Sequence, residues 1–282
     1  MKKTAILVLT GFILLFNQAF AQNWFEIKEV MPKTWVIGDN GSDNIYLVEG
    51  SEKALLIDTG LGAADLAGDV KKLTGKPVLV VNTHGHPDHS GSNYQFDKIY
   101  MHQADIEAAK MYSAPEMRKN VGSSMLNGKK PGETEIYKGN EITPEYISVS
   151  DGFEFNLGDR IITVMETPGH TPGSICLLDV KNKVLFSGDN NNTHVWLFLE
   201  GCSPLSDYLK TLEKQLSKLD KFTTLYPGHG PAMESSFIKD QAECVKQILN
   251  GTCKPIPYES FAGPASQCSF GQATVAFNPK NL

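Results

Sequence analysis

Residues 81–91 read Val-Asn-Thr-His-Gly-His-Pro-Asp-His-Ser-Gly, so three imidazoles and one carboxylate lie within six residues. The stretch follows an apolar run, residues 78–81, that has the length and composition of a buried strand. A loop that leaves such a strand can bring polar side chains together without burying them unpaired. His and Asp are common ligands of divalent transition metals, and the whole chain has only seven His. The stretch therefore predicts a metal site rather than a surface loop with a chance run of His.

The first 21 residues have the pattern of a secretory signal peptide. Residues 1–3 are Met-Lys-Lys, residues 5–16 are almost entirely apolar, and residues 19–21 are Ala-Phe-Ala, a small-x-small cleavage site. The apolar run is too short for a comfortable transmembrane helix and no Cys follows the cleavage site, so we expect no stable membrane anchor. We expect residues 1–21 to be removed and residues 22–282 to form a single domain that is exported, to the periplasm or beyond.

The charge of the chain argues against one class of partner. Loss of Lys2 and Lys3 with the signal changes the formal net charge from −6 to −8. Such an acidic chain is not expected to bind nucleic acid, so we expect a small-molecule substrate. Small anions are not excluded, because a bound metal ion makes its own site locally positive. Nothing in the pattern favours one oligomeric state.

The five Cys residues form no CxxC pair, which argues against a Cys-based zinc knuckle. Cys176 and Cys244 lie in apolar patterns and are expected in the core. In an oxidising compartment Cys253 and Cys268 could close a loop in the C-terminal tail, although free or buried thiols fit the sequence equally well.

Short apolar strands alternate with amphipathic helices along the chain. Residues 62–74 and about 234–249 repeat apolar side chains at helical spacing, and the helix after Ser203-Pro204 carries a row of Leu on one face. This alternation predicts an α/β layered fold with sheets inside and helices outside. Residues 113–143 sustain no apolar period and are interpreted as an insertion or long loop over the site. Residues 255–282 show no strong period either and are interpreted as a tail.

Three later loops share the properties of the first. Each follows an apolar strand and carries one candidate ligand next to glycine: His170, Asp189 and His229. Glycine has no Cβ and lets the backbone approach a site closely. His170 or His229 alone would more often be structural, and Asp189 alone could equally form an Asx turn, but together they predict that four loops converge on one site.

As a set these motifs resemble the metallo-β-lactamase superfamily. They are His-x-His-x-Asp-His from His84, Pro-Gly-His-Thr-Pro-Gly-Ser around His170, Ser-Gly-Asp ending at Asp189, and Pro-Gly-His-Gly around His229. The similarity begins at the Asp58-Thr59-Gly60 strand end and spans nearly all of the mature chain. It implies a four-layer αββα sandwich with a binuclear metal site at one edge.

The resemblance also assigns roles to individual residues. Seven ligands would divide between two ions: His84, His86 and His170 for the first, Asp88, His89 and His229 for the second, and Asp189 as the bridge. Asp58 would lie behind these ligands and hold their loops in place.

The expected chemistry follows from the ligand types. Neutral His ligands leave a divalent ion strongly electrophilic, and such an ion lowers the pKa of bound water from about 16 toward about 7. A hydroxide held between two ions would attack, with Asp88 orienting it, while the ions polarise the scissile group. We therefore expect hydrolysis of an ester, thioester, lactone, amide or phosphodiester. Nitrogen and oxygen ligands with His in excess suit two zinc ions best, and iron or manganese also fits such a site.

Asp189 separates subclasses within the resemblance. Members with Asp at the Ser-Gly-Asp position include glyoxalase II-like enzymes, lactonases and phosphodiesterases, whereas many β-lactamases have a Cys ligand there. A second β-lactamase subclass uses an Asp-His-His site without that Cys, so hydrolysis of β-lactam amides is one alternative. A mononuclear iron persulfide dioxygenase and a non-catalytic metal- or ligand-binding relative are the others.

The loop after Asp189 is the candidate wall of a substrate pocket. It carries three consecutive Asn residues followed by Thr, His, Val and Trp. Within it Asn192 and His194 are the candidate substrate contacts, and a solvated loop is the competing interpretation.

Overall fold

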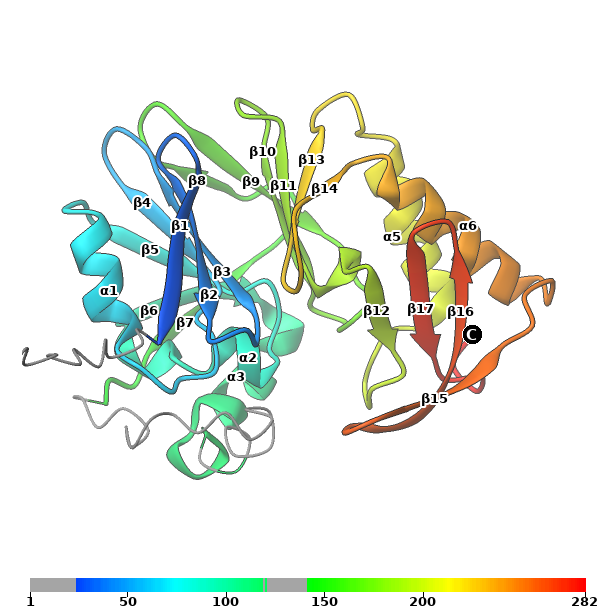
Figure 1. Cartoon of the computed structure of the whole chain (residues 1–282). Helices are drawn as coiled ribbons and strands as arrows, with labels where there is room; N and C mark the ends of the chain where they lie inside the picture. Colours follow the sequence, from blue (N-terminus) through cyan, green and yellow to red (C-terminus); the bar gives the residue numbers. More distant parts are fainter. Residues whose placement is uncertain (1–23, 119, 121–140) are drawn as a thin grey trace, which may run out of the picture.

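The computed structural model describes residues 24–118, 120 and 141–282 (Figure 1). The expected signal segment and most of residues 113–143 lie outside this part of the chain. Among the described residues, no helix combines the length and apolar composition that a membrane crossing needs. Two sheets pack face to face with helices on their outer faces, which confirms the expected α/β class and αββα layering.

The first sheet contains seven strands in sequence order. Neighbours from β1 to β4 pair antiparallel, and neighbours from β4 to β7 pair parallel. The strands are β1 (Phe25–Met31), β2 (Thr34–Asp39), β3 (Asn44–Glu49), β4 (Ala54–Ile57), β5 (Val78–Val81), β6 (Lys98–His102) and β7 (Glu145–Val149). Side-chain alternation buries both faces: in β3, Tyr46 and Val48 pack toward the second sheet, and Ile45 and Leu47 toward the helices.

The second sheet has six strands in the order β14-β13-β11-β10-β9-β8. Its pairs are antiparallel except for β11 and β13, which run parallel. The strands are β8 (Glu154–Asn156), β9 (Ile161–Glu166), β10 (Ile175–Asp179), β11 (Val184–Gly188), β13 (Thr224–Pro227) and β14 (Met233–Glu234). In β10, Ile175 and Leu177 face the first sheet, while Cys176 and Leu178 face the helices on the other side.

The helices cover the outer faces of the two sheets. They are α1 (Leu66–Leu73), α3 (Ile106–Ser113), α5 (Leu205–Leu216) and α6 (Phe237–Leu249), whereas the short α2 (Pro87–Ser90) lies in the loop after β5. The α1 helix begins where the Asp65 side chain accepts a hydrogen bond from the Gly68 amide, and its buried Leu66 and Val70 lie one turn apart. These two side chains pack with the outer face of the first sheet.

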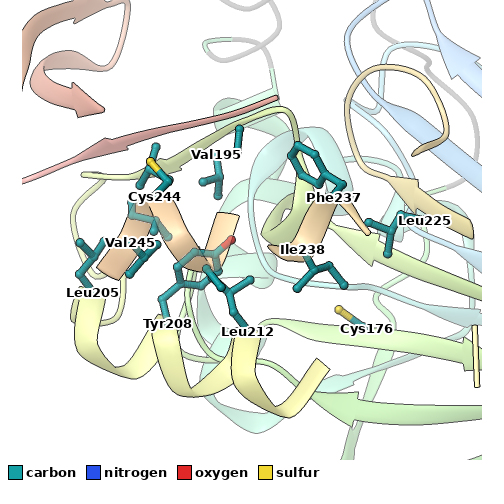
Figure 2. Packing of buried hydrophobic residues seen from close by; sticks show 14 of the residues in the cluster. Cys176, Val195, Leu205, Tyr208, Leu212, Leu225, Phe237, Ile238, Cys244 and Val245 are labelled. Carbon is teal, nitrogen blue, oxygen red and sulfur yellow. The ribbon is translucent and has the colours of Figure 1, made fainter. Parts of the chain in front are cut away.

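Figure 2 shows how α5 and α6 pack against the outer face of the second sheet. Leu205, Tyr208 and Leu212 line one side of α5 at helical spacing and meet Val245 of α6. The buried Tyr208 hydroxyl donates a hydrogen bond to the Asn190 carbonyl, so its polar end is satisfied inside the core. The loop that carries Asn190 is therefore attached directly to this packed core.

The interpretation of residues 255–282 as a tail without regular structure is wrong. They contribute three strands to a third sheet of order β12-β17-β16-β15, with β12 (His194–Leu197), β15 (Ile256–Ser260), β16 (Gly263–Phe270) and β17 (Ala273–Phe277). This sheet buries Val195, Val275 and Phe277 against α5 and α6. The strands are hard to recognise because the sheet is mostly buried on one face only and β15 is largely exposed.

Cys253 and Cys268 form a disulfide, with their Cα atoms 6.4 Å apart. It joins the segment after α6 to the middle of β16. Cys176 and Cys244 lie buried in the core, as the sequence predicts.

We expect the double substitution of Cys253 and Cys268 by Ser to lower the free energy of unfolding by about 3 kcal/mol. The disulfide closes a loop of 15 residues, and its loss gives the unfolded chain more conformational freedom. Urea unfolding followed by circular dichroism measures the change. A reducing agent should destabilise the wild-type chain to the level of the variant and should leave the variant unchanged. Equal stability of the oxidised wild type and the variant would contradict this prediction.

Candidate metal centre

The candidate ligands lie where parallel strands of both sheets end. In the first sheet β4 ends immediately before Asp58, and the parallel β5 leads into the loop of residues 82–89, which includes α2. In the second sheet the parallel β11 and β13 lead to Asp189 and His229. The carboxyl ends of parallel strands are where α/β folds bring functional loops together.

The structure brings the seven candidate ligands into three overlapping groups. In each group the ligand atoms lie within 4.8 Å of one another, close to the spacing of ligands that are each about 2 Å from one ion. The groups are His84, His86 and His170; Asp88, His89 and His229; and His84, His89 and Asp189. The first two match the division that the resemblance implies, and the third joins Asp189 to one His from each.

Asp189 lies between the two groups of His residues. Its carboxylate oxygens are 3.3 Å from the Nε2 atoms of His89 and His229, and 3.5 Å from Nε2 of His170. Gly228 permits this convergence, because a Cβ at that position would collide with the Asp189 carboxylate and the His89 ring.

Several of these polar atoms are buried and unpaired among the described residues. The Nε2 atoms of His84 and His89 and one carboxylate oxygen of Asp189 have no hydrogen-bond partner there. A buried polar atom without a partner costs about 1–3 kcal/mol. Lone pairs of nitrogen and oxygen that converge in this way fit divalent metal ions, which would satisfy all of them.

The outer nitrogen of each ring determines which atom faces the centre. Nδ1 of His170 is 2.7 Å from the Trp196 carbonyl, and Nδ1 of His229 is 2.7 Å from the Ser42 carbonyl. Because a carbonyl only accepts, Nδ1 of each ring carries a proton, and Nε2 is the nitrogen that faces the cluster, where a metal ion would bind it. His86 is oriented the other way, with its Nδ1 2.8 Å from Nε2 of His170.

Asp58 holds two further His rings. Its carboxylate accepts hydrogen bonds from the Thr83 amide at 2.7 Å, the Thr83 hydroxyl at 2.8 Å and Nδ1 of His89 at 2.9 Å. Since the Thr83 hydroxyl gives its proton to Asp58, it accepts from Nδ1 of His84 at 3.1 Å. Asp58 has a φ of +66°, a left-handed conformation that Asp tolerates better than most residues.

Electrostatics divides the cluster into two kinds of His. Burial, with the neighbouring His170, lowers the pKa of His86 to about 3, and burial also lowers the pKa of His84 well below its ordinary value. Burial acts in the same direction on His229, but Asp189 and Asp88 outweigh it and raise the pKa of His229 well above its ordinary value. His84 and His86 are therefore neutral. The carboxylates of Asp88 and Asp189 lie on the other side of the cluster, next to His229.

Asp105 organises the centre, although the sequence did not single it out. Its buried carboxylate accepts from the Gly85 amide at 2.9 Å, the Thr171 hydroxyl at 2.6 Å and the Gly173 amide at 2.9 Å. It thus connects the loop that carries His84 and His86 to the loop that carries His170. Asp105 lies at the start of α3, where an acidic residue is normally interpreted as a helix cap. The sequence therefore shows no sign that it connects the two loops.

A family model described as the metallo-beta-lactamase superfamily matches residues 38–229, more than half of the chain. The chain belongs to this superfamily. Acyl-coenzyme A thioesterase MBLAC2 from Homo sapiens is 38% identical over 205 residues, which are 66% of this chain and 72% of that protein. A protein from Aquifex aeolicus (strain VF5), described as uncharacterized, is 30% identical over 185 residues, which are 64% of this chain and 80% of that protein.

Solved structures of the superfamily share the fold. A metallo-beta-lactamase from Pontibacter korlensis superposes with a TM-score of 0.58 at 19% identity, over 79% of this chain and 99% of that chain. The sec-alkylsulfatase Pisa1 from Pseudomonas sp. gives 0.63 at 18% identity, over 80% of this chain and 42% of that chain. At such identities the similarity concerns the fold alone.

A cavity of about 540 Å³ opens over the candidate metal centre of this superfamily member. Its volume lies within the usual range for small-molecule sites. Both Asn192 and His194 line it, and the Asn192 side chain also accepts a hydrogen bond from the His229 amide at 3.1 Å. Tyr112 of α3 and Phe261 of the β15–β16 turn line it as well, and sequence reasoning missed both. Each is a single aromatic residue in a stretch without a sustained pattern.

We expect Asp105→Asn to lower metal affinity about 10- to 100-fold and to lower the free energy of unfolding by about 1–3 kcal/mol. The amide keeps one acceptor oxygen but turns an NH₂ group toward donors that now bond to a carboxylate. Metal titration and urea unfolding measure the two effects.

Glu107→Gln is the matched control for this prediction. Glu107 is the next acidic residue, its side chain is 81% exposed, and it forms an ion pair with Lys110 on the surface. The control should resemble the wild type in both measurements, and the same result for Asp105→Asn would disprove the organising role.

Proposed function

We propose that the chain is a metal-dependent hydrolase that cleaves thioesters. The observation that carries the proposal is the convergence of seven His and Asp side chains with buried, unpaired ligand atoms at the base of a cavity. Superfamily membership and relatives named as acyl-coenzyme A thioesterases support hydrolysis and point to the thioester as the bond.

Two divalent ions, with zinc as the best match to the donor set, would be held by His84, His86 and His170 on one side and by Asp88, His89 and His229 on the other. Asp189 would contact both. Such ions would supply a Lewis acid for the thioester carbonyl and would lower the pKa of the attacking water toward 7.

The reaction consumes one water molecule. The water oxygen bonds to the thioester carbonyl carbon and the carbon–sulfur bond breaks. The products are a carboxylate and a thiol. One proton of the water ends on the thiol sulfur, and the other is released. We assign to Asp88, whose buried carboxylate lines the cavity, the task of orienting the water and accepting that proton. Asn192 and His194 are the polar cavity groups assigned to orient the substrate.

We expect the purified protein to contain close to two divalent ions per chain and to hydrolyse a thioester. His86→Ala should lower the metal content and reduce kcat/KM by at least about 10³-fold, because it removes a ligand and leaves its partners unpaired. His102→Ala is the matched control, since His102 is the last residue of β6 in the same sheet and lies outside the three ligand groups. Elemental analysis and a thiol-release assay measure both quantities. Full turnover by the metal-free protein would disprove the mechanism.

A panel of substrates separates this proposal from the alternatives. A thioester, a lactone, a phosphodiester and a β-lactam are compared at equal metal loading, and the thioester should have the highest kcat/KM. A β-lactam that is cleaved faster would favour a β-lactamase. One iron per chain with oxygen consumption on a persulfide would favour the dioxygenase. Metal binding without any turnover would favour a non-catalytic relative.

We also propose that the enzyme acts after export, to the periplasm of its cell or beyond. The composition of residues 1–21 and the Cys253–Cys268 disulfide, a bond typical of oxidising compartments, support this. The full chain expressed in a host with a periplasm should appear in the osmotic-shock fraction with a mass that begins at Gln22. A variant lacking residues 2–21 should stay in the cytoplasm. An uncleaved wild-type chain in the cytoplasm would contradict the proposal.

A further inference from the structure

A cluster of aromatic side chains lies at one side of the cavity. Trp196 of β12 contacts Phe198, Tyr258 and Phe261, with ring centroids 5.2, 6.1 and 5.5 Å apart. His194 packs edge-on against Tyr258 at 4.7 Å. Trp196, Phe261 and His194 line the cavity, so this aromatic wall (Trp196, Phe198, Tyr258 and Phe261) presents an apolar face to it.

The wall is connected directly to the candidate metal centre. The Trp196 carbonyl accepts the hydrogen bond from Nδ1 of His170 at 2.7 Å. The backbone that orients a candidate ligand therefore also positions the indole. A substrate whose carbonyl lies at the His and Asp cluster has the wall within reach of one of its two arms.

The far end of the wall comes from the β15–β16 hairpin. Phe261 lies in its turn and is 72% exposed, the largest exposed fraction among the described large apolar side chains. β16 pairs with β17, and the Cys253–Cys268 disulfide fixes the base of the hairpin, while its tip extends over the cavity. An exposed aromatic ring at the mouth of a cavity is typical of a binding surface.

We propose that this wall binds the acyl group of the thioester and makes the enzyme selective for apolar acyl groups larger than acetyl. The proposal rests on the proposed thioester hydrolysis. Apolar acyl carbons gain free energy when they leave water for an aromatic surface. The thiol arm of coenzyme A carries phosphates, and the carboxylate of Glu200, which lines the same cavity, repels them. The apolar surface of the wall and this negative charge in the cavity therefore favour the acyl arm over the phosphate-bearing thiol arm.

The hairpin lies outside the part of the chain that the superfamily model matches. The family match ends at residue 229, so Tyr258 and Phe261 lie beyond it. The metal ligands therefore account for the cleavage of the bond, and the hairpin for the choice of acyl group.

The test compares acetyl, butyryl and octanoyl thioesters of one small thiol, N-acetylcysteamine. The metal-loaded wild type should prefer octanoyl over acetyl by at least about tenfold in kcat/KM. Phe261→Ala should lower kcat/KM for octanoyl about tenfold, mostly through KM, and leave acetyl within about twofold, because it removes one apolar contact and no catalytic group. Because Phe261 is exposed, we expect the Phe261→Ala variant to fold like the wild type.

Phe270→Ala is the matched control. Phe270 is a partly exposed aromatic residue at the other end of β16, away from the residues that line the cavity. It should leave the acyl preference unchanged.

Octanoate should inhibit the wild type with a Ki about tenfold lower than for Phe261→Ala, which gives a binding measurement independent of turnover.

A second series varies the thiol at a fixed octanoyl group, with coenzyme A and N-acetylcysteamine. If Phe261→Ala changes the ratio between the two thiols and not the acyl preference, the wall binds the thiol arm and the proposal is wrong. Equal rates on all acyl groups in the wild type would also overturn it while leaving thioester hydrolysis intact. If the metal-loaded wild type cleaves no thioester, the proposed function itself fails.

Discussion

The carboxylate of Asp58 connects the two parallel strands on which the candidate metal centre depends. Asp58 directly follows β4. Its carboxylate accepts hydrogen bonds from the amide and hydroxyl of Thr83, which follows β5, and from His89. Hydrogen bonds to a buried charged group are stronger than those between neutral groups. Asp105 does the same between the His84 loop and the His170 loop. Two buried carboxylates thus hold the loops to the tolerance that a metal site requires.

The sequence predicted those parts of the molecule whose pattern is local. Strands buried on both faces, such as β4 and β11, appear as short apolar runs, and β11 leads directly to the candidate ligand Asp189. The grouping of His84, His86 and His170 came from the resemblance rather than from spacing. Asp105 escaped because its three partners come from loops about 20 and 66–68 residues away, a distance at which one sequence has no signal.

The C-terminal strands escaped for a different reason. β15 is mostly exposed, and β16 buries mainly Cys268, so neither shows a strong alternation of apolar and polar residues. β15 is held by its pairing with β16, and β16 by its pairing with β17 and by the disulfide, all of which are tertiary features. Because the β15–β16 hairpin buries few apolar side chains, Phe261 in its turn faces the cavity instead of the core.

The two parts of the site are under different physical constraints. The His and Asp cluster lies where strands of both sheets end, and a change at Gly228 or Asp58 would displace several candidate ligands at once. The hairpin tip packs mainly on Trp196, so a substitution at Phe261 changes the cavity without disturbing a core. In the proposed enzyme, hydrolysis needs the first and acyl recognition uses the second, so acyl selectivity could vary in this fold while the hydrolytic centre is kept. The Trp196 carbonyl accepts a hydrogen bond from His170, so a movement of the β12 backbone would tilt this candidate ligand. Changes in acyl selectivity are therefore limited to substitutions of side chains.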